Sequence, residues 1–131
     1  MSSKLDNGRA SFAFQCADTT KQLSYAKEYK QYSKKLPMMI KTNGLAATFA
    51  FMLSKDQNKN EGKAYHKLGD DILYWLKTCN TTNDIFQNKS TFKDLVQDVI
   101  NLDSFKYNLI TQETINFLLW LRRFTEGLIN D

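Results

Sequence analysis

The sequence predicts an all-α fold from three observations. Apolar residues recur at intervals of three and four positions, which is the spacing of an amphipathic helix rather than of a strand. Strand signals are scarce, since the 131 residues include one proline and no alternating run of Val, Ile and Thr. The length fits one domain. We therefore expect residues 1–131 to form a single compact bundle of about five or six helices, with a kinked apolar helix at its centre.

The first helical region is expected from about Asp6 to Ser33, with a bend near Thr19 and Thr20, where two β-branched residues meet. Its tyrosines recur at helical spacing, so we interpret them as core rings with hydroxyl groups at the rim rather than as a base-stacking surface. The residues expected to face inward are Phe12, Cys16, Leu23, Tyr25, Tyr29 and Tyr32.

A second helix is expected to begin near Leu36, because Pro37 is suited to a first helical turn, where its missing N–H needs no partner. Asn43-Gly44 interrupts this segment as either a kink or a cap between two helices. Leu45–Leu53 is apolar almost all round, which predicts a helix surrounded by others. Its expected core residues include Phe49 and Phe51.

Two polar segments, residues 56–62 and residues 80–90, are expected to be exposed loops. The helix between them has an apolar stripe on one face, and its charged residues are expected to be solvated. The stripe consists of Tyr65, Leu68, Ile72, Trp75, Leu76 and Cys79, and the solvated residues are Lys63, Lys67, Asp70, Asp71 and Lys77.

Two further helices are expected after residue 90. The first is short and amphipathic, from Phe92 to Ile100. A turn through residues 102–110 then leads to Thr111, the predicted N-cap of the last helix, with Glu113 near its positive end. The last helix carries its apolar stripe on Phe117, Leu121, Phe124 and Leu128.

Charge is distributed unevenly along the chain. Between Lys21 and Lys67 ten lysines stand against three acidic residues, a net charge of +7, whereas residues 70–131 hold nine acidic and six basic residues, a net charge of −3. This asymmetry suggests a polyanion for the basic half and basic partner surfaces for the other. A pI of about 9.0 favours nucleic acid, while a total charge of only +4 argues against a histone-like binder.

No set of catalytic or metal-ligating residues is evident. The only histidine, His66, lacks an acidic neighbour on its predicted face and is interpreted as an ordinary surface residue. Cys16 and Cys79 have no ligand pair nearby and are expected to be buried in a reducing cytosol. Phosphate loops, metal motifs and long apolar stretches are also missing from the sequence. We therefore expect a cytoplasmic protein that is not an enzyme, with no cofactor, no metal site and no membrane contact.

One segment resembles a known family. Residues 36–55 read Leu-Pro-Met-Met-Ile-Lys-Thr-Asn-Gly-Leu-Ala-Ala-Thr-Phe-Ala-Phe-Met-Leu-Ser-Lys. This resembles the signature of the small helical subunit of Cmr complexes, the fifth named protein of these type III-B CRISPR RNA-guided effector assemblies. In that signature a basic residue and Leu-Pro precede a kinked helix with Asn-Gly-Leu that ends in Ser-Lys. The motifs Gly8-Arg9-Ala10, Tyr74-Trp75-Leu76 and Leu121-Arg122-Arg123-Phe124, followed by Gly127, extend the resemblance over nearly the whole chain.

The resemblance implies a non-catalytic ribonucleoprotein subunit of antiviral defence, which stacks along the backbone subunits and lines the groove for guide and target RNA. The implied partners are the backbone subunits, the large signalling subunit, CRISPR RNA, target RNA and further stacked copies of the chain. Contacts to the RNA backbone are expected from residues at matching family positions: Lys41, Asn43, Lys55, Arg122 and Arg123. A second group, chosen from charge alone and expected at the surface, is Lys27, Lys30, Lys34 and Lys35.

Two alternatives remain open. The same cations are suited to acidic patches of neighbouring subunits, and Arg122 or Arg123 is suited to an acidic partner within the bundle. The alternative function is a protein-interaction adaptor or inhibitor with no direct nucleic-acid role, whose lysines serve solubility alone. An RNA-binding measurement separates it from the first function.

Overall fold

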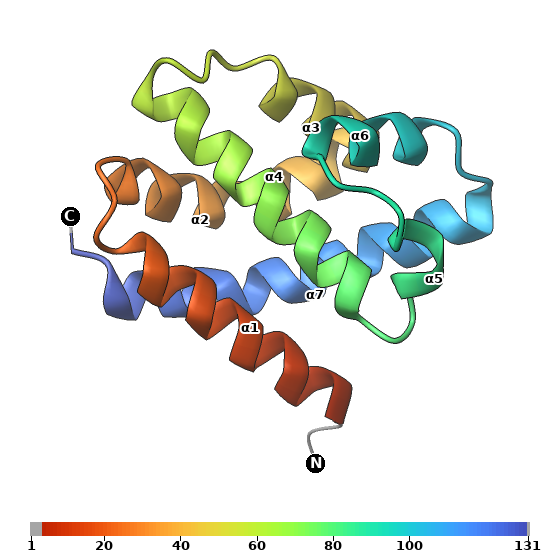
Figure 1. Cartoon of the computed structure of the whole chain (residues 1–131), viewed down its shortest axis with the longest axis horizontal. Coiled ribbons are helices and arrows are strands. Elements are labelled where there is room, and N and C mark those ends of the chain that lie inside the picture. The colour runs from red at the N-terminus through yellow and green to blue at the C-terminus, as the bar shows by residue number, and fades with distance from the viewer. Residues whose placement is uncertain (1–3, 131) are drawn as a thin grey trace.

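The computed structural model describes residues 4–130, and within them it contains seven α helices and no strand (Figure 1). The all-α prediction is confirmed, although the helix number exceeds the expected five or six. The helices are α1 (Lys4–Thr20), α2 (Ala26–Asn43), α3 (Leu45–Leu53), α4 (Asn60–Thr78), α5 (Asn83–Phe86), α6 (Phe92–Ile100) and α7 (Ser104–Leu128). None of them is long and apolar enough to cross a bilayer.

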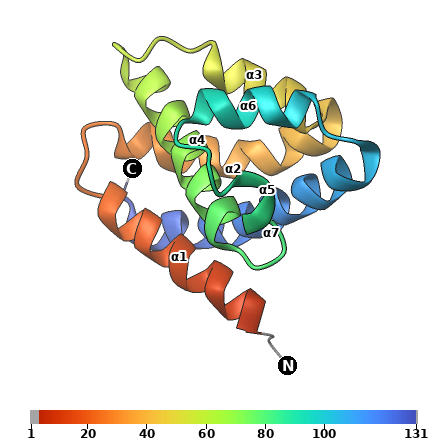
Figure 2. The same ribbon diagram turned by 45° about the vertical axis from the view of Figure 1, so that its right-hand side comes forward.

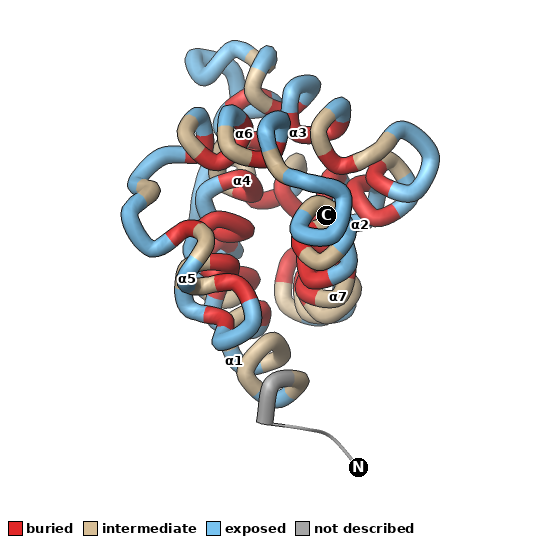
Figure 3. The backbone as a smooth tube through the Cα atoms, turned by 90° about the vertical axis from the view of Figure 1, so that its right-hand side faces the viewer, coloured by how far each residue is buried: buried red, intermediate tan, exposed pale blue. Residues whose placement is uncertain are grey.

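The longest helix, α7, passes behind α1 and α4 in Figure 1 and packs against α1, α2 and α4. Helices α3 and α6 lie side by side at the end of the molecule away from α1, as the turned view in Figure 2 shows. The inward sides of the helices are buried and most of the connecting loops are exposed (Figure 3). The core therefore lies between α7 and the helices that cover it.

The region expected as one bent helix from Asp6 to Ser33 is two helices. Both threonines before the break donate their hydroxyl groups to carbonyl oxygens of the preceding turn: Thr20 Oγ1 to Cys16 O at 2.6 Å and Thr19 Oγ1 to Gln15 O at 2.9 Å. Such bonds compete with the helical ladder and bend it. The chain then turns before α2, and the prediction that Leu23 faces inward is wrong, because this turn leaves it exposed.

The prediction that Pro37 begins a helix is also wrong, because α2 runs through it. A proline inside a helix removes one backbone hydrogen bond and costs about 3 kcal/mol. Here the helix carries a buried stripe on both sides of the proline, so tertiary packing outweighs that cost. The buried stripe includes Tyr29, Ser33, Leu36, Pro37 and Ile40.

Gly44 separates α2 from α3, so of the two open interpretations the cap is correct. Its φ of 90° lies in the region that favours glycine, and its N–H donates to Ile40 O at 2.8 Å. Helix α3 is less enclosed than expected. Phe49 is fully buried, whereas Phe51 is 38% exposed, so the prediction that Phe51 lies in the core is wrong.

Two boundaries in the second half differ from the prediction. Residues 80–90 contain the short helix α5, whose Phe86 is fully buried. The expected turn over residues 102–110 is mostly helix, because the N-cap of α7 is Asp103, whose Oδ1 accepts from the N–H of Lys106 at 2.9 Å. Thr111 lies inside α7, and its hydroxyl donates to Tyr107 O.

Two carboxylates are buried, contrary to expectation: Asp71 on α4 was expected at the surface, and Glu113 on α7 was expected near the end of a helix. Asp71 accepts from the Tyr29 hydroxyl at 2.6 Å and from Lys67 Nζ with both oxygens at 2.8 Å. Burial, followed by the charge of Asp71, raises the pKa of Tyr29 well above its ordinary value. Glu113 lies in the middle of α7, where it pairs with Arg9. Both carboxylates can be buried because hydrogen-bond and ion-pair partners satisfy them, from α2 and α4 for Asp71 and from α1 and α4 for Glu113.

The different burial of Phe49 and Phe51 predicts different stability losses. Phe49→Ala should reduce the free energy of unfolding by about 3–5 kcal/mol, because a fully buried ring leaves a cavity. Phe51→Ala should cost only about 1–2 kcal/mol, since the ring is partly exposed. Urea denaturation measures both values, and equal losses would contradict the burial difference.

Alkaline pH should destabilise the fold through Tyr65. Burial, then the neighbouring Tyr32 and Glu61, raise the pKa of Tyr65 to about 12. An unfolded tyrosine ionises near pH 10, so between about pH 10 and 12 the unfolded state binds fewer protons and stability falls as pH rises, by at most about 1.4 kcal/mol per pH unit. Tyr65→Phe should flatten this fall in urea midpoints measured from about pH 8 to about pH 11.5. A variant that loses stability as steeply as the parent would contradict the assignment.

Candidate nucleic-acid interface

Helices α2 and α7 pack side by side and antiparallel. Lys30 Nζ donates to Ile129 O at 2.8 Å, and the Ser33 and Thr125 hydroxyl oxygens lie 2.9 Å apart. The residue number on α7 falls as that on α2 rises, which fixes the antiparallel direction. The exposed sides of both helices therefore belong to one continuous surface.

The exposed side of α2 is basic along its whole length. Lys27, Lys34 and Lys41 are all exposed and follow one another at intervals of seven residues, which is about two helical turns or about 10 Å. Met38 lies between the last two and is 66% exposed. The only acidic residue of α2, Glu28, is half-buried. The helix thus presents a row of ammonium groups with one thioether among them.

The end of α7 adds two arginines to this row. Lys34, Arg122 and Arg123 line one open hollow of about 440 Å³ together with Glu126. Lys34 Nζ forms an ion pair with Glu126, and the Arg123 guanidinium lies 5.4 Å from the centre of the Trp120 ring. We define the α2–α7 face as Lys27, Lys34, Lys41, Arg122 and Arg123.

Two of the predicted residues lie on the other flank of α2. Lys35 and Asn43 line a hollow of about 350 Å³ whose remaining residues are Met38, Met39 and Thr42. The Lys35 ammonium also lies 5.4 Å from the centre of the Tyr32 ring. This flank is more apolar than the α2–α7 face and adjoins it at Met38.

Lys55 lies apart from both hollows, just after α3. Its ammonium lies 4.4 Å above the Phe51 ring and 3.8 Å from Glu61 Oε1, and its side chain is half-buried. The expected surface residue His66 is also half-buried, with Nε2 3.2 Å from Lys55 O. The structure therefore does not bring Lys55 together with the arginines of α7.

Lys30 is not a surface residue, so that prediction is wrong. The residue is only 6% exposed, and its ammonium donates to a carbonyl oxygen at the end of α7. The position of Lys30 on α2, between the exposed row and the buried stripe, turns its side chain toward the neighbouring helix.

Sequence reasoning also missed Glu126 as the partner of Lys34. One signal was available, because Glu126 lies four residues after Arg122 and three after Arg123 on the same helix, a spacing that brings charges together. Which cation it pairs with depends on how α2 packs against α7. Among the described residues, no group of three or more His, Cys, Asp or Glu side chains is placed to hold a metal ion.

Comparison with known proteins supplies the family. The family model described as CRISPR-associated protein (Cas_Cmr5) matches residues 5–128. The chain belongs to the Cmr5 family. A relative from Thermus thermophilus, named CRISPR system Cmr subunit Cmr5, is 26% identical over 105 residues, which cover 79% of this chain and 77% of the relative.

The Cmr5 fold is recognisable in a solved structure as well. The X-ray crystal structure of a CRISPR-associated Cmr5 family protein from Thermus thermophilus superposes with a TM-score of 0.78 at 21% identity, covering 98% of this chain and 100% of the other. Two of the short motifs that extend the resemblance have structural roles in this chain. Arg9 and Trp75 both donate to Glu113, and a side chain at Gly8 would begin 3.4 Å from the Trp75 ring.

Substitution of Lys30 tests whether this lysine stabilises the fold or binds RNA. Lys30→Met should lower the thermal midpoint, because Ile129 O loses its donor in a buried site, at a cost of about 1–3 kcal/mol. Affinity for single-stranded RNA, measured below the midpoint, should stay that of the parent. A loss of RNA affinity without a loss of stability would place Lys30 among the binding residues.

Proposed function

We propose that this chain is a non-catalytic small subunit of a type III-B CRISPR (Cmr) effector complex in cytoplasmic antiviral defence, and that it contacts guide or target RNA through the phosphate backbone. Membership of the Cmr5 family supports the complex, since the relative from Thermus thermophilus is named a Cmr subunit. The implied partners are the backbone subunits, the large signalling subunit and further stacked copies. The chain's own contribution to the complex would be its α2–α7 face.

The proposed RNA contact is supported mainly by the five cations that lie on the α2–α7 face. Three come from α2 at two-turn intervals and two from the far end of α7, although these helices are distant in the sequence. A row with this spacing suits a polyanion whose charges also recur at regular intervals. Three of the five cations are lysines, which carry little base-reading capacity, so we expect the face to bind the backbone rather than the sequence.

Base pairing between guide and target RNA explains why a protein subunit would need to recognise only the RNA backbone. In RNA-guided complexes base pairing with the guide supplies the sequence specificity, and proteins hold the duplex by its shape and phosphates. The exposed lysines of α2 are held on a rigid helix, because Tyr29, Ser33 and Leu36 on its opposite side are buried. A rigid row needs less ordering when RNA binds.

The remaining predicted contacts form a second part of the proposal. Asn43 and Lys35 lie on the methionine-lined flank beside the α2–α7 face, where an amide and an ammonium would reach sugar or phosphate oxygens. Lys55 would contact RNA only after leaving Glu61, whose carboxylate lies 3.8 Å away. Lys30 is excluded from the proposed contacts by its burial.

Salt dependence tests the proposal. If the α2–α7 face contacts about three to five phosphates, the logarithm of affinity for single-stranded RNA should fall with the logarithm of salt concentration at a slope of about −2 to −3.5. Lys41→Ala, Arg122→Ala and Arg123→Ala should each weaken binding of unrelated RNA sequences alike and flatten the slope by less than about one unit. Fluorescence anisotropy over a salt series measures both quantities.

Lys93→Ala is the matched control, since Lys93 is an exposed lysine on α6. It should leave the affinity and the slope unchanged. Equal losses at all four positions, or losses that depend on RNA sequence, would contradict a localised backbone contact and favour the protein-interaction adaptor.

A further inference from the structure

A second surface, on α4, has features that the RNA contact does not use. Tyr74 is 57% exposed, and its ring stacks on Phe12 with centroids 5.0 Å apart and an angle of 21° between planes. Phe12 in turn stacks on Phe117 at 5.6 Å, so Tyr74 ends a column of aromatic rings that reaches into the core. Because one face of Tyr74 lies against this column and the residue is 57% exposed, we infer that the other face of the ring is accessible to a ligand.

An unpaired carboxylate lies near this ring. Asp70 precedes Tyr74 by four residues on α4, which puts both side chains on the same side of the helix. Within the described part of the chain Asp70 accepts no hydrogen bond and forms no ion pair, because its neighbour Lys67 uses its ammonium on Asp71. Desolvation of Asp70 and the charge of the adjacent Asp71 raise the pKa of Asp70, and together they outweigh the opposing charges of His66 and Lys67.

Asp70 and Tyr74 line one hollow of about 290 Å³. Its other lining residues are Leu73, Lys77, Ser90 and Thr91. The hollow thus combines an open aromatic face, an unpaired carboxylate and two hydroxyl groups. A ligand that fills it needs a flat surface for the ring and hydrogen-bond donors with positive charge for the carboxylate.

The guanidinium group of arginine meets both requirements. It is planar, stacks on aromatic faces and presents a fork of N–H donors that matches a carboxylate. A phosphate would be repelled by Asp70, and among the described residues Lys77 is the only cation that lines the hollow. Tyrosine and arginine are also frequent anchors of protein interfaces.

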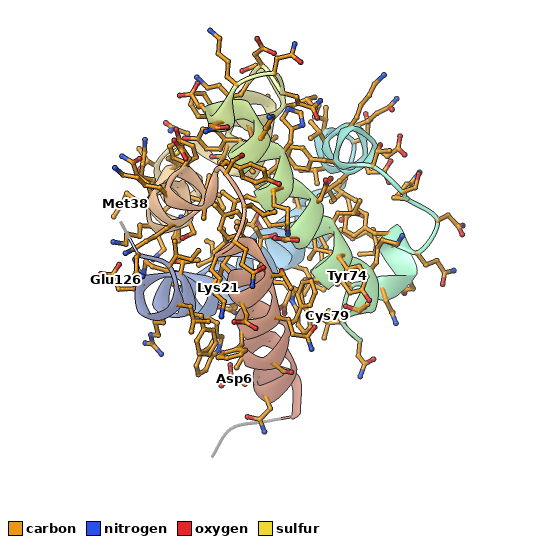
Figure 4. All side chains as sticks on the ribbon, turned by 60° about the vertical axis from the view of Figure 1, so that its left-hand side comes forward. Asp6, Lys21, Met38, Tyr74, Cys79 and Glu126 are labelled. Atoms are coloured by element: carbon orange, nitrogen blue, oxygen red, sulfur yellow. The ribbon has the colours of Figure 1, made fainter. Side chains whose placement is uncertain are left out.

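We propose that the Asp70–Tyr74 hollow is a docking site for an arginine side chain of a partner protein. Figure 4 shows Tyr74 on the opposite side of α1 from Met38 and Glu126, which mark the α2–α7 face. The hollow therefore lies on another part of the surface than the α2–α7 face. The docking site does not depend on the RNA contacts proposed above, and either is testable without the other.

A titration with a small probe tests the chemistry of the site. N-acetyl-arginine amide, added to the ¹⁵N-labelled protein, should shift the amide resonances of Asp70, Tyr74 and Thr91, and N-acetyl-lysine amide at equal concentration should shift them less. Asp70→Asn and Tyr74→Ala should each weaken binding of the arginine probe roughly 2- to 5-fold, the range for an exposed ion pair or cation–π contact. Tyr74→Phe, which keeps the ring, should bind as the parent does.

Asp84→Asn is the charge-matched control, because it removes an exposed carboxylate from α5 rather than from the hollow. Equal shifts with both probes, or equal weakening by Asp84→Asn, would overturn the proposal. So would an RNA oligonucleotide that shifts the same resonances and binds more weakly to Tyr74→Ala, since that result would make the ring a platform for bases.

Assembly of the whole complex gives a second, independent test. Asp70→Arg should reduce the amount of this subunit that co-purifies with the other Cmr subunits, while the thermal midpoint of the free subunit stays that of the parent and its RNA affinity does not fall. Unchanged recovery in the complex would overturn the docking site. Loss of RNA affinity in Lys41→Ala with normal recovery would confirm that the two surfaces act separately.

Discussion

The buried carboxylate of Glu113 holds together the three helices that frame the molecule. It accepts from Arg9 Nε at 2.6 Å, from Arg9 Nη2 at 2.9 Å and from Trp75 Nε1 at 2.8 Å, so α1 and α4 are both joined to α7 at one point. The Glu113 hydrogen bond, opposed by burial, raises the pKa of Arg9. Losing one partner of a buried ion pair costs about 3–5 kcal/mol, a large share of the roughly 5–15 kcal/mol that stabilises a domain.

Helix α2 is attached to this frame by smaller polar contacts. Tyr29 donates to Asp71 on α4, Ser33 pairs with Thr125 on α7, and Lys30 donates to the carbonyl of Ile129. These contacts lie away from the exposed row of lysines, so each fixes the rotation of the helix about its axis. The basic side of α2 is exposed because the other side carries the apolar stripe and the polar groups that have hydrogen-bond partners inside the bundle.

Much of the candidate RNA surface could be predicted, and its exceptions have physical causes. Lys41, Arg122 and Arg123 are exposed as expected, since each lies on the polar side of an amphipathic helix. Lys30 is buried because its ammonium donates to the Ile129 carbonyl at the end of α7. Lys55 is half-buried because it lies against the Phe51 ring and the Glu61 carboxylate. The Asp70–Tyr74 hollow could not be predicted, because the sequence does not show which of two adjacent aspartates on a helix is buried and which is exposed.

The helical fold class, the apolar stripe of α4, the charge asymmetry and the family resemblance could all be read from the residues alone, because periodicity and residue order are local properties of the chain. The residues alone did not determine that α2 continues through Pro37, that α7 begins just after Asp103, or which of two adjacent aspartates on α4 is buried. These three features follow from how the helices pack. Each depends on groups distant in sequence, whose packing and hydrogen bonds outweigh local preferences worth about 1–3 kcal/mol.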